Sequence, residues 1–233
     1  MPVSALGFWH KRLADHGFAV REQSRFGEKA LGFSHPCGLD YELVGIADDN
    51  RKPYSNGQVP SELAIRGTHG IVVSVREHET SSEFMTLAWS GKRIAEDGRF
   101  VRYVFGDDAT GPFSGRIVDF MLEPELPQAS WTYGEGVVHH CAFQVDDYGA
   151  QDAVKFRLEG LGFTDTSERK DRGYFDSIYV RTPAGALFEA TVSKPGGMTV
   201  DEKVDELGAS FQVPPPFRHR TAELMAYLEP LKY

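Results

Sequence analysis

The sequence predicts an α+β fold built from repeated units, each with the order strand, helix, strand, strand, strand. Two observations support this prediction. The patterns of apolar residues follow this order in residues 62–127 and again in residues 134–196. Short segments also align between units: HPCGLDYELV with TPAGALFEAT, and THGIVVSV with HHCAFQV. The first pair shares Pro, Gly and Glu at the same spacing, and the second sets Val75 on Val145 and His69 on His139.

Residues 1–58 predict a partial unit, which lacks its first strand and ends in a linker. The apolar residues of the opening segment fall at helical spacing, and Gly17 suits the end of that helix. Residues 25–46 indicate a strand, the turn HPCG and a second strand. Residues 48–60 are rich in Asp, Asn, Gly and Pro and indicate the linker.

Residues 62–127 predict a complete unit. It begins with the strand GTHGIVVSV and continues with a helix over residues 77–89. Two prolines in EPELPQAS close it. The other strands are expected at residues 92–95, 100–105 and 115–122.

Residues 134–196 predict a second complete unit, which begins with the strand GVVHHCAFQV. A helix over residues 147–161 has its apolar residues on one stripe, with Gly162 at its end. Residues 197–233 indicate a tail that wraps this unit and ends in a short helix. The other strands are expected at residues 162–166, 174–181 and 186–192, and the tail helix near 221–228.

Composition excludes several classes of partner. Of 233 residues, 41% are hydrophobic and 25% charged, the balance of an ordinary globular protein. The net charge of −9 argues against nucleic acid or an anionic membrane as the main partner, because both need a basic face. No apolar run approaches the roughly 20 residues needed to span a bilayer. The start shows no signal-peptide pattern, and Cys37 and Cys141 form no motif, which together predict a cytoplasmic protein without disulfides.

His140 is the first candidate metal ligand. It follows His139 within a predicted apolar strand. Side chains alternate across a strand, so we expect the two rings to face opposite sides, with only one pointing into a cavity lined by the sheet. The alternative is a structural pair, one ring buried and hydrogen-bonded and the other exposed.

Glu189 is the second candidate. It lies among apolar neighbours in GALFEATV, where a carboxylate is costly unless it is paired or bound to a metal. A salt bridge at a strand end is the alternative. Glu42 holds the equivalent place in the first unit, where we interpret it as a structural residue.

A histidine and a carboxylate on separate strands of one sheet make part of the 2-His-1-carboxylate arrangement. That arrangement holds one face of a non-heme Fe(II) and leaves positions open for substrate and O₂. Imidazole and carboxylate suit Fe(II), with Mn(II) as the alternative ion, and the sequence offers no cluster of thiolates for structural zinc.

The run of residues 136–191 resembles the last unit of the ring-cleaving dioxygenases that act on hydroquinones and chlorohydroquinones. The matching pieces are GVVHHCAFQV and RGYFDSIYVRTPAGALFEAT, and the likeness extends through the earlier units to the tail MTVDEKVDELG. It implies the vicinal-oxygen-chelate fold, in which βαβββ modules form cupped mixed sheets. It also implies a non-heme iron dioxygenase that takes a small aromatic substrate and O₂.

The resemblance also implies roles for four residues. The family's metal-binding His and Glu fall on His140 and Glu189, and its second-sphere Arg and Tyr fall on Arg172 and Tyr179. A guanidinium could stabilise a bound phenolate, and a tyrosine hydroxyl could donate a hydrogen bond to substrate. Without the resemblance, Arg172 would be taken as a surface residue and Tyr179 as a core aromatic.

The sequence departs from the family in its metal ligands. The family's second histidine comes from the first strand of an additional N-terminal module, and this sequence holds no such module. His69 aligns with His139, which predicts that it faces away from the cavity, and Gly70 takes the ligand position. The remaining histidines are interpreted as surface residues: His10, His16, His35, His78 and His219.

Two consequences follow from this departure. The metal site should have two protein ligands from this chain, which weakens binding. The partial first unit should leave a sheet edge unpaired, which favours association as a homo-oligomer or with a completing partner chain. A truncated product and a mis-assigned start are further explanations of the same pattern.

The sequence leaves three functions open. The first is a ring-cleaving dioxygenase. The second is a glyoxalase-type lyase or isomerase, which the small number of well-placed ligands disfavours. The third is a non-catalytic module that binds small molecules without a metal.

Overall fold

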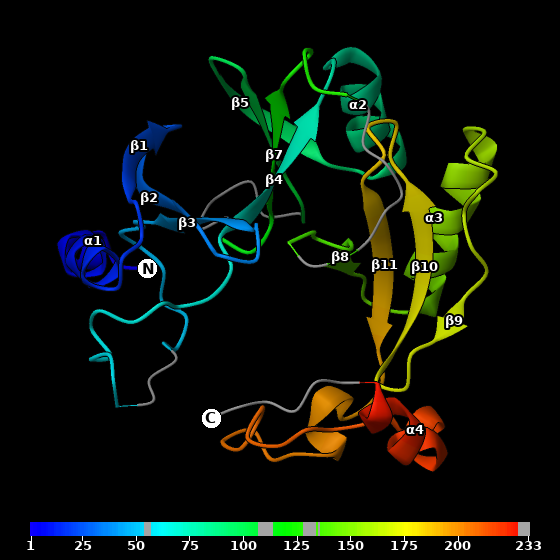
Figure 1. Ribbon diagram of the computed structural model, residues 1–233. Helices are drawn as coiled ribbons and strands as arrows, with labels where there is room; N and C mark the ends of the chain where they lie inside the picture. Colours follow the sequence, from blue (N-terminus) through cyan, green and yellow to red (C-terminus); the bar gives the residue numbers. More distant parts are fainter. Residues whose placement is uncertain (54–56, 107–113, 128–133, 135, 228–233) are drawn as a thin grey trace. The chain divides into compact units, whose positions relative to one another are not determined.

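The computed structural model describes residues 1–53, 57–106, 114–127, 134 and 136–227. It confirms an α+β fold with mixed sheets (Figure 1). The chain forms two compact units, one of Met1–Cys141 with Thr182–Ala186, and one of Ala142–Arg181 with Leu187–Tyr233. Among the described helices, none is both long and apolar enough to cross a membrane.

The first sheet of unit 1 has three antiparallel strands in the order β1-β2-β3. The expected helix and the strands on either side of the HPCG turn are confirmed. β1 was not predicted, because REQSR carries no apolar residue. A two-residue hairpin turn at Phe26 and Gly27, both with positive φ, joins it to β2. The elements are η1 (Val3–Ala5), α1 (Leu6–Asp15), β1 (Arg21–Arg25), β2 (Glu28–Ser34) and β3 (Asp40–Val44).

The second sheet of unit 1 has the order β4-β7-β6-β5, with β4 parallel to β7 and the other pairs antiparallel. Every element expected in residues 62–127 is confirmed. The helix changes to a π-helical turn at Phe84, and Tyr103 and Phe120 are among the most buried side chains of the sheet. The elements are β4 (Gly70–Val75), α2 (Glu79–Glu83), η2 (Phe84–Ala88), β5 (Lys92–Asp97), β6 (Phe100–Val104) and β7 (Ile117–Leu122).

The sheet of unit 2 has the order β8-β11-β10-β9. Its helix begins at an N-cap, Asp147, whose side chain accepts a hydrogen bond from the Ala150 N–H at 2.8 Å. From this helix the buried Gln151 side chain donates to the carbonyls of Asp176 at 2.9 Å and Ala190 at 2.8 Å. One side chain thus joins the helix to two strands. The elements are β8 (Cys141–Gln144), α3 (Tyr148–Gly160), β9 (Lys170–Asp171), β10 (Phe175–Arg181) and β11 (Leu187–Ser193).

Two strand predictions in this unit were wrong in extent or place. The strand expected over residues 136–145 begins only at Cys141, so both histidines precede it. The strand expected over residues 162–166 is a series of turns. Gly162 has φ of 91°, and the Phe163 N–H donates back to the Leu158 carbonyl at 3.0 Å, which closes the helix end instead of starting a strand.

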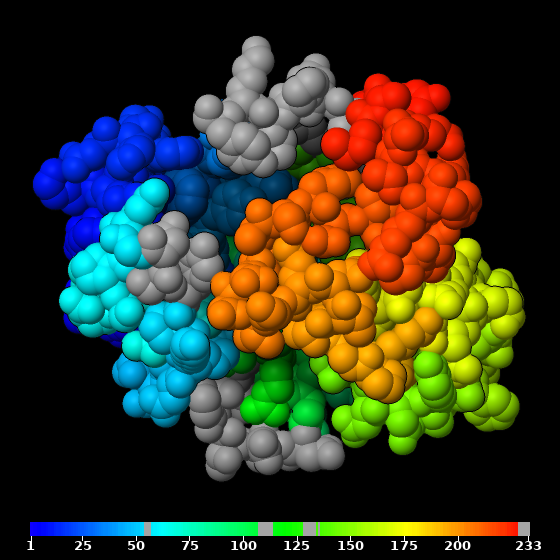
Figure 2. Space-filling model, turned by 90° about the horizontal axis from the view of Figure 1, so that it is seen from below, coloured from blue at the N-terminus to red at the C-terminus, as the bar shows by residue number. Residues whose placement is uncertain are grey.

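The tail of unit 2 lies at the surface, as the orange-to-red segment of Figure 2 shows. In this tail, Asp201 accepts hydrogen bonds from the Tyr174 hydroxyl and from Arg218. The expected helix near the end of the chain is confirmed in part, over residues 221–226. The elements are η3 (Gly197–Val200), η4 (Pro215–Arg220) and α4 (Thr221–Ala226).

The turns that precede β3 and β11 share one hydrogen-bond pattern. His35 N–H donates to the Leu39 carbonyl and Gly38 N–H to the His35 carbonyl, at 2.8 and 2.9 Å. Thr182 and Gly185 make the same two bonds, at 2.9 and 2.8 Å. Glu42 and Glu189 therefore occupy equivalent strand positions, as the sequence alignment predicted.

Candidate functional site

Glu189 lies on one face of the β10–β11 pair. It stands opposite Tyr179 in the ladder, and Ser177 stands opposite Thr191. Because side chains alternate across strands, these four residues share one face. The other face carries Phe188, Ala190 and Ile178, which are buried. The sheet thus separates a polar face from the apolar core of unit 2.

The Glu189 carboxylate is 1% exposed. It accepts a hydrogen bond from the Ser177 hydroxyl, which also lies 3.4 Å from Thr191 Oγ1. A carboxylate at this depth is costly unless polar groups or a cation compensate its charge. Its position therefore fits a residue that binds a cation. Sequence reasoning missed Ser177 and Thr191, although their two-residue spacing from Tyr179 and Glu189 marks the same strand face.

Arg172 and Tyr179, to which the resemblance assigns second-sphere roles, are in contact. Arg172 Nε donates to the Tyr179 hydroxyl at 3.1 Å, and its guanidinium lies 5.2 Å from the centre of the ring. A tight turn holds the arginine: its own N–H donates to the Phe175 carbonyl at 2.9 Å, and Gly173 has φ of 85°. Because the tyrosine oxygen accepts from Arg172, its hydrogen can be donated to a ligand.

His140 lies one residue before β8 and is exposed. Its Nδ1 lies 2.7 Å from Nδ1 of His139, with the two rings perpendicular and their centres 5.0 Å apart. The expectation that the two rings face opposite sides is therefore wrong, because the backbone at the pair is not a strand. At this distance one Nδ1 donates and the other accepts, so one ring lacks a proton there.

The Cys141 thiol lies next to this pair in the chain. Burial raises its pKa to about 11, so it is protonated at neutral pH. A protonated thiol is a poor metal ligand.

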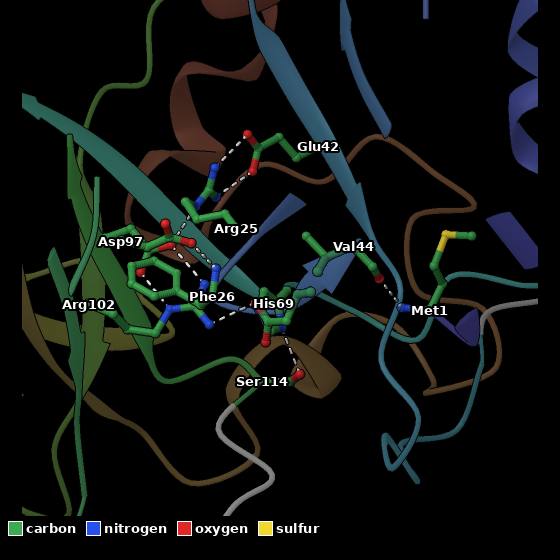
Figure 3. Close-up of polar contacts among 11 residues, drawn as sticks. Met1, Arg25, Phe26, Glu42, Val44, His69, Asp97, Arg102 and Ser114 are labelled. Carbon is green, nitrogen blue, oxygen red and sulfur yellow. Dashed lines mark hydrogen bonds and ion pairs between the residues drawn. The ribbon is translucent and has the colours of Figure 1, made fainter. Parts of the chain in front are cut away.

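His69 and Glu42 belong to an ionic network in unit 1 (Figure 3). The two nitrogens of His69 lie 2.9 Å from Ser114 Oγ and 3.3 Å from Glu28 Oε2. Burial acts to raise the pKa of Glu28, but hydrogen bonds from His69 and Arg102 outweigh it and hold that pKa below its ordinary value. These contacts give His69 a structural role.

Arg25 connects the two sheets of this network. It forms two hydrogen bonds with the Glu42 carboxylate, at 3.1 and 2.6 Å, and one with Asp119 at 3.2 Å. Arg102 donates two further hydrogen bonds to the Asp119 carboxylate, from Nε at 2.7 Å and from Nη2 at 2.9 Å. These contacts support the structural interpretation of Glu42.

The available donors fit part of a metal site. One imidazole and one carboxylate match the ligands that Fe(II) and Mn(II) take in proteins. Among the described residues there is no group of three His, Cys, Asp or Glu side chains that could hold an ion. His140 and Glu189 therefore stay predicted ligands, with donor groups of the right kind.

Comparison with known proteins gives one consistent class. The chain is 40% identical over 227 residues to a chlorohydroquinone/hydroquinone 1,2-dioxygenase of Sphingobium indicum, an alignment that covers 96% of this chain and 69% of that protein. It is 29% identical over 214 residues to MhqE of Bacillus subtilis, whose name assigns it provisionally to the ring-cleaving dioxygenases, with 92% and 67% covered. No family model matches the chain.

A solved structure agrees with this class. The crystal structure of a provisionally assigned dioxygenase from Bacillus subtilis superposes with a TM-score of 0.85 at 26% sequence identity. The superposition covers 99% of this chain and 71% of that one. The fold described here is therefore the fold of that protein over nearly the whole chain.

Proposed function

The chain belongs to the ring-cleaving dioxygenases of the vicinal-oxygen-chelate superfamily, and from this premise we propose that it acts on a hydroquinone-type aromatic ring. The observation that carries the proposal is the shared face of β10 and β11, where a buried carboxylate, a tyrosine and an arginine converge. Such a face suits a flat ring with ionisable hydroxyl groups.

The proposed cofactor is Fe(II), with His140 and Glu189 as ligands. When bound, the ion would supply electron transfer between the ring and O₂. The protein's own task is to place the ligands and to fix the charge around them.

The residues near Glu189 have separate tasks in this proposal. Ser177 donates to the carboxylate and fixes its orientation. The Arg172 guanidinium is a permanent cation and stabilises the negative charge of a deprotonated ring hydroxyl. The Tyr179 hydroxyl, held by Arg172, donates its hydrogen to a ring oxygen. Together they favour a phenolate over a neutral phenol in the site.

Oxygen consumption with hydroquinone tests the activity. We expect Fe(II)-loaded wild-type protein to consume O₂ and release a ring-opened acid, and Glu189→Gln to lose this activity. Glu42→Gln is the matched control, because it changes the equivalent glutamate outside the proposed site. Hydroquinone binding without ring opening, unchanged in Glu189→Gln, would instead support a non-catalytic binding module.

A further inference from the structure

Arg172 lies at the end of a short hairpin. β9 has only two residues, and a two-residue loop of Gly173 and Tyr174 leads from Arg172 into β10. The Arg172 N–H donates to the Phe175 carbonyl at 2.9 Å, and Gly173 supplies the positive φ, 85°, that the first position of such a loop requires. An edge strand this short makes few sheet bonds. Contacts to the loop therefore bear directly on the position of Arg172.

The hairpin places Arg172 on the polar face of the sheet. Lys170 stands opposite Ser177 in the ladder, and Arg172 stands opposite Phe175. Because side chains alternate along each strand, Arg172 shares the face of Ser177 and Tyr179. Its Nε donates to the Tyr179 hydroxyl at 3.1 Å. A displacement of the hairpin end would lengthen or break this hydrogen bond.

The tail packs beside the loop of the hairpin. A Cβ atom placed on Gly173 would lie 3.4 Å from Pro216, 3.5 Å from Pro215 and 3.6 Å from Pro214. Figure 1 shows this stretch, at the start of η4, beside the end of β9 and β10. Val213, which precedes the prolines, is buried. Since each proline ring fixes its own backbone angle φ, the three form a stiff surface against the loop.

Asp201 binds the second residue of the loop. The buried Tyr174 donates its hydroxyl hydrogen to the Asp201 carboxylate, which also accepts from Arg218. The hydrogen bond from Tyr174 lowers the pKa of Asp201 below its ordinary value, against the opposing effect of burial. The acceptor is therefore charged at neutral pH, which strengthens both bonds. Asp201 follows η3 and Arg218 lies in η4, so one carboxylate joins the loop to two parts of the tail.

We propose that Tyr174 and Asp201 are positioning residues, through which the tail holds Arg172 against Tyr179. The prolines and the carboxylate fix the loop, and the adjoining arginine then keeps one orientation. This inference rests on the proposed function, in which Arg172 stabilises a deprotonated ring hydroxyl. A cation does this well only from a fixed place, because a preorganised charge costs no rearrangement when the phenolate forms.

Exchange of the Arg172 Nε–H with water tests the positioning in the full chain without ligand or metal. Heteronuclear NMR follows this group, and Arg172→Lys identifies its signal by removing it. We expect about fivefold faster exchange in Tyr174→Phe, since that variant loses the hydrogen bond to Asp201. Tyr227→Phe is the matched control, because it makes the same change at an exposed tyrosine of the tail, and its exchange should equal that of the wild type. Equal exchange in Tyr174→Phe and the wild type would overturn the proposal.

A second pair of variants decides the question if Tyr174→Phe fails to fold. Asp201→Ala removes the acceptor of the same hydrogen bond. Glu223→Ala is its control, because it removes a carboxylate of the tail that pairs with Arg220. We expect faster exchange of the Arg172 Nε–H in Asp201→Ala alone. Equally fast exchange in Glu223→Ala would contradict the proposal, because general loosening of the tail would then explain the effect.

Binding of 4-nitrophenol separates failure of this proposal from failure of the proposed function. The ionised form of this phenol is yellow, so an absorbance titration gives its pKa in the site. We expect the wild type to lower that pKa and Tyr174→Phe to lower it less. An equal lowering in both proteins would show that Tyr174 does not act on the phenol through Arg172 and would overturn the proposal. A pKa that the wild type leaves at its value in water would contradict the proposed function, while the exchange rates still decide the positioning.

Discussion

At the scale of single residues, Arg172 and Tyr179 form one polar pair, because Nε of the arginine donates to the tyrosine hydroxyl at 3.1 Å. The orientation of His140 could not be predicted, because it depends on where β8 begins.

The Tyr179 hydroxyl should contribute to ligand binding. Under the proposed function, Tyr179→Phe removes one hydrogen bond to a ring oxygen. A neutral hydrogen bond is worth about 1 kcal/mol, so we expect hydroquinone to bind about fivefold more weakly. Calorimetric titration of the metal-loaded protein measures the change. Tyr148→Phe is the control, because that hydroxyl donates to Asp176 from α3. An equal loss in both variants would contradict the role given to Tyr179.

Asp49 should make stability depend on pH. Hydrogen bonds from Arg51, at 2.9 and 2.7 Å, lower its pKa from 3.8 to about 2 despite its burial. Because the folded-state pKa lies below the unfolded one, this contribution is present above pH 4 and is lost as the pH falls toward 2. Discounted for the partial exposure of Arg51, it amounts to about 1–2 kcal/mol.

Urea unfolding of wild type and Asp49→Asn at several pH values measures this contribution. The variant should be less stable at pH 7, and the difference should shrink below pH 4. A difference that stays constant down to pH 2.5 would show that the ion pair is not its source.

At the scale of elements, periodicity predicted strands with clear apolar patterns and failed elsewhere. β1 consists of polar residues, and pairing with β2 is what makes it a strand. Residues 162–166 were expected as a strand, but a glycine with positive φ turns the chain there. Pairing partners and backbone angles of this kind are not encoded in a local pattern of apolar residues.

Gln151 should be a main support of the β10–β11 pair. Gln151→Ala removes the buried side-chain donor that the carbonyls of Asp176 and Ala190 share. We expect a loss of about 2–4 kcal/mol in the free energy of unfolding. Gln144→Ala, at an exposed position of β8, should change it by less than about 0.5 kcal/mol. Denaturant titration of both variants measures the difference, and similar values for the two would refute the joining role of Gln151.

At the scale of the whole molecule, the repeat places two glutamates at equivalent positions, but their surroundings differ. Glu42 and Glu189 are equivalent by their turns, but Arg25 neutralises Glu42. Arg25 also contacts Asp119, which is 94 residues away in sequence. The sequence revealed the repeat through aligned motifs. The contacts of Arg25 depend on how two sheets pack, and no motif records that.

Anaerobic calorimetric titration with Fe(II) tests the proposal that Glu189 binds the metal of a ring-cleaving dioxygenase. We expect saturable binding by the wild type, at least tenfold weaker binding by Glu189→Ala, and no change in Glu42→Ala. Equal binding by the wild type and Glu189→Ala would contradict the claim, because the buried carboxylate would then not be a ligand.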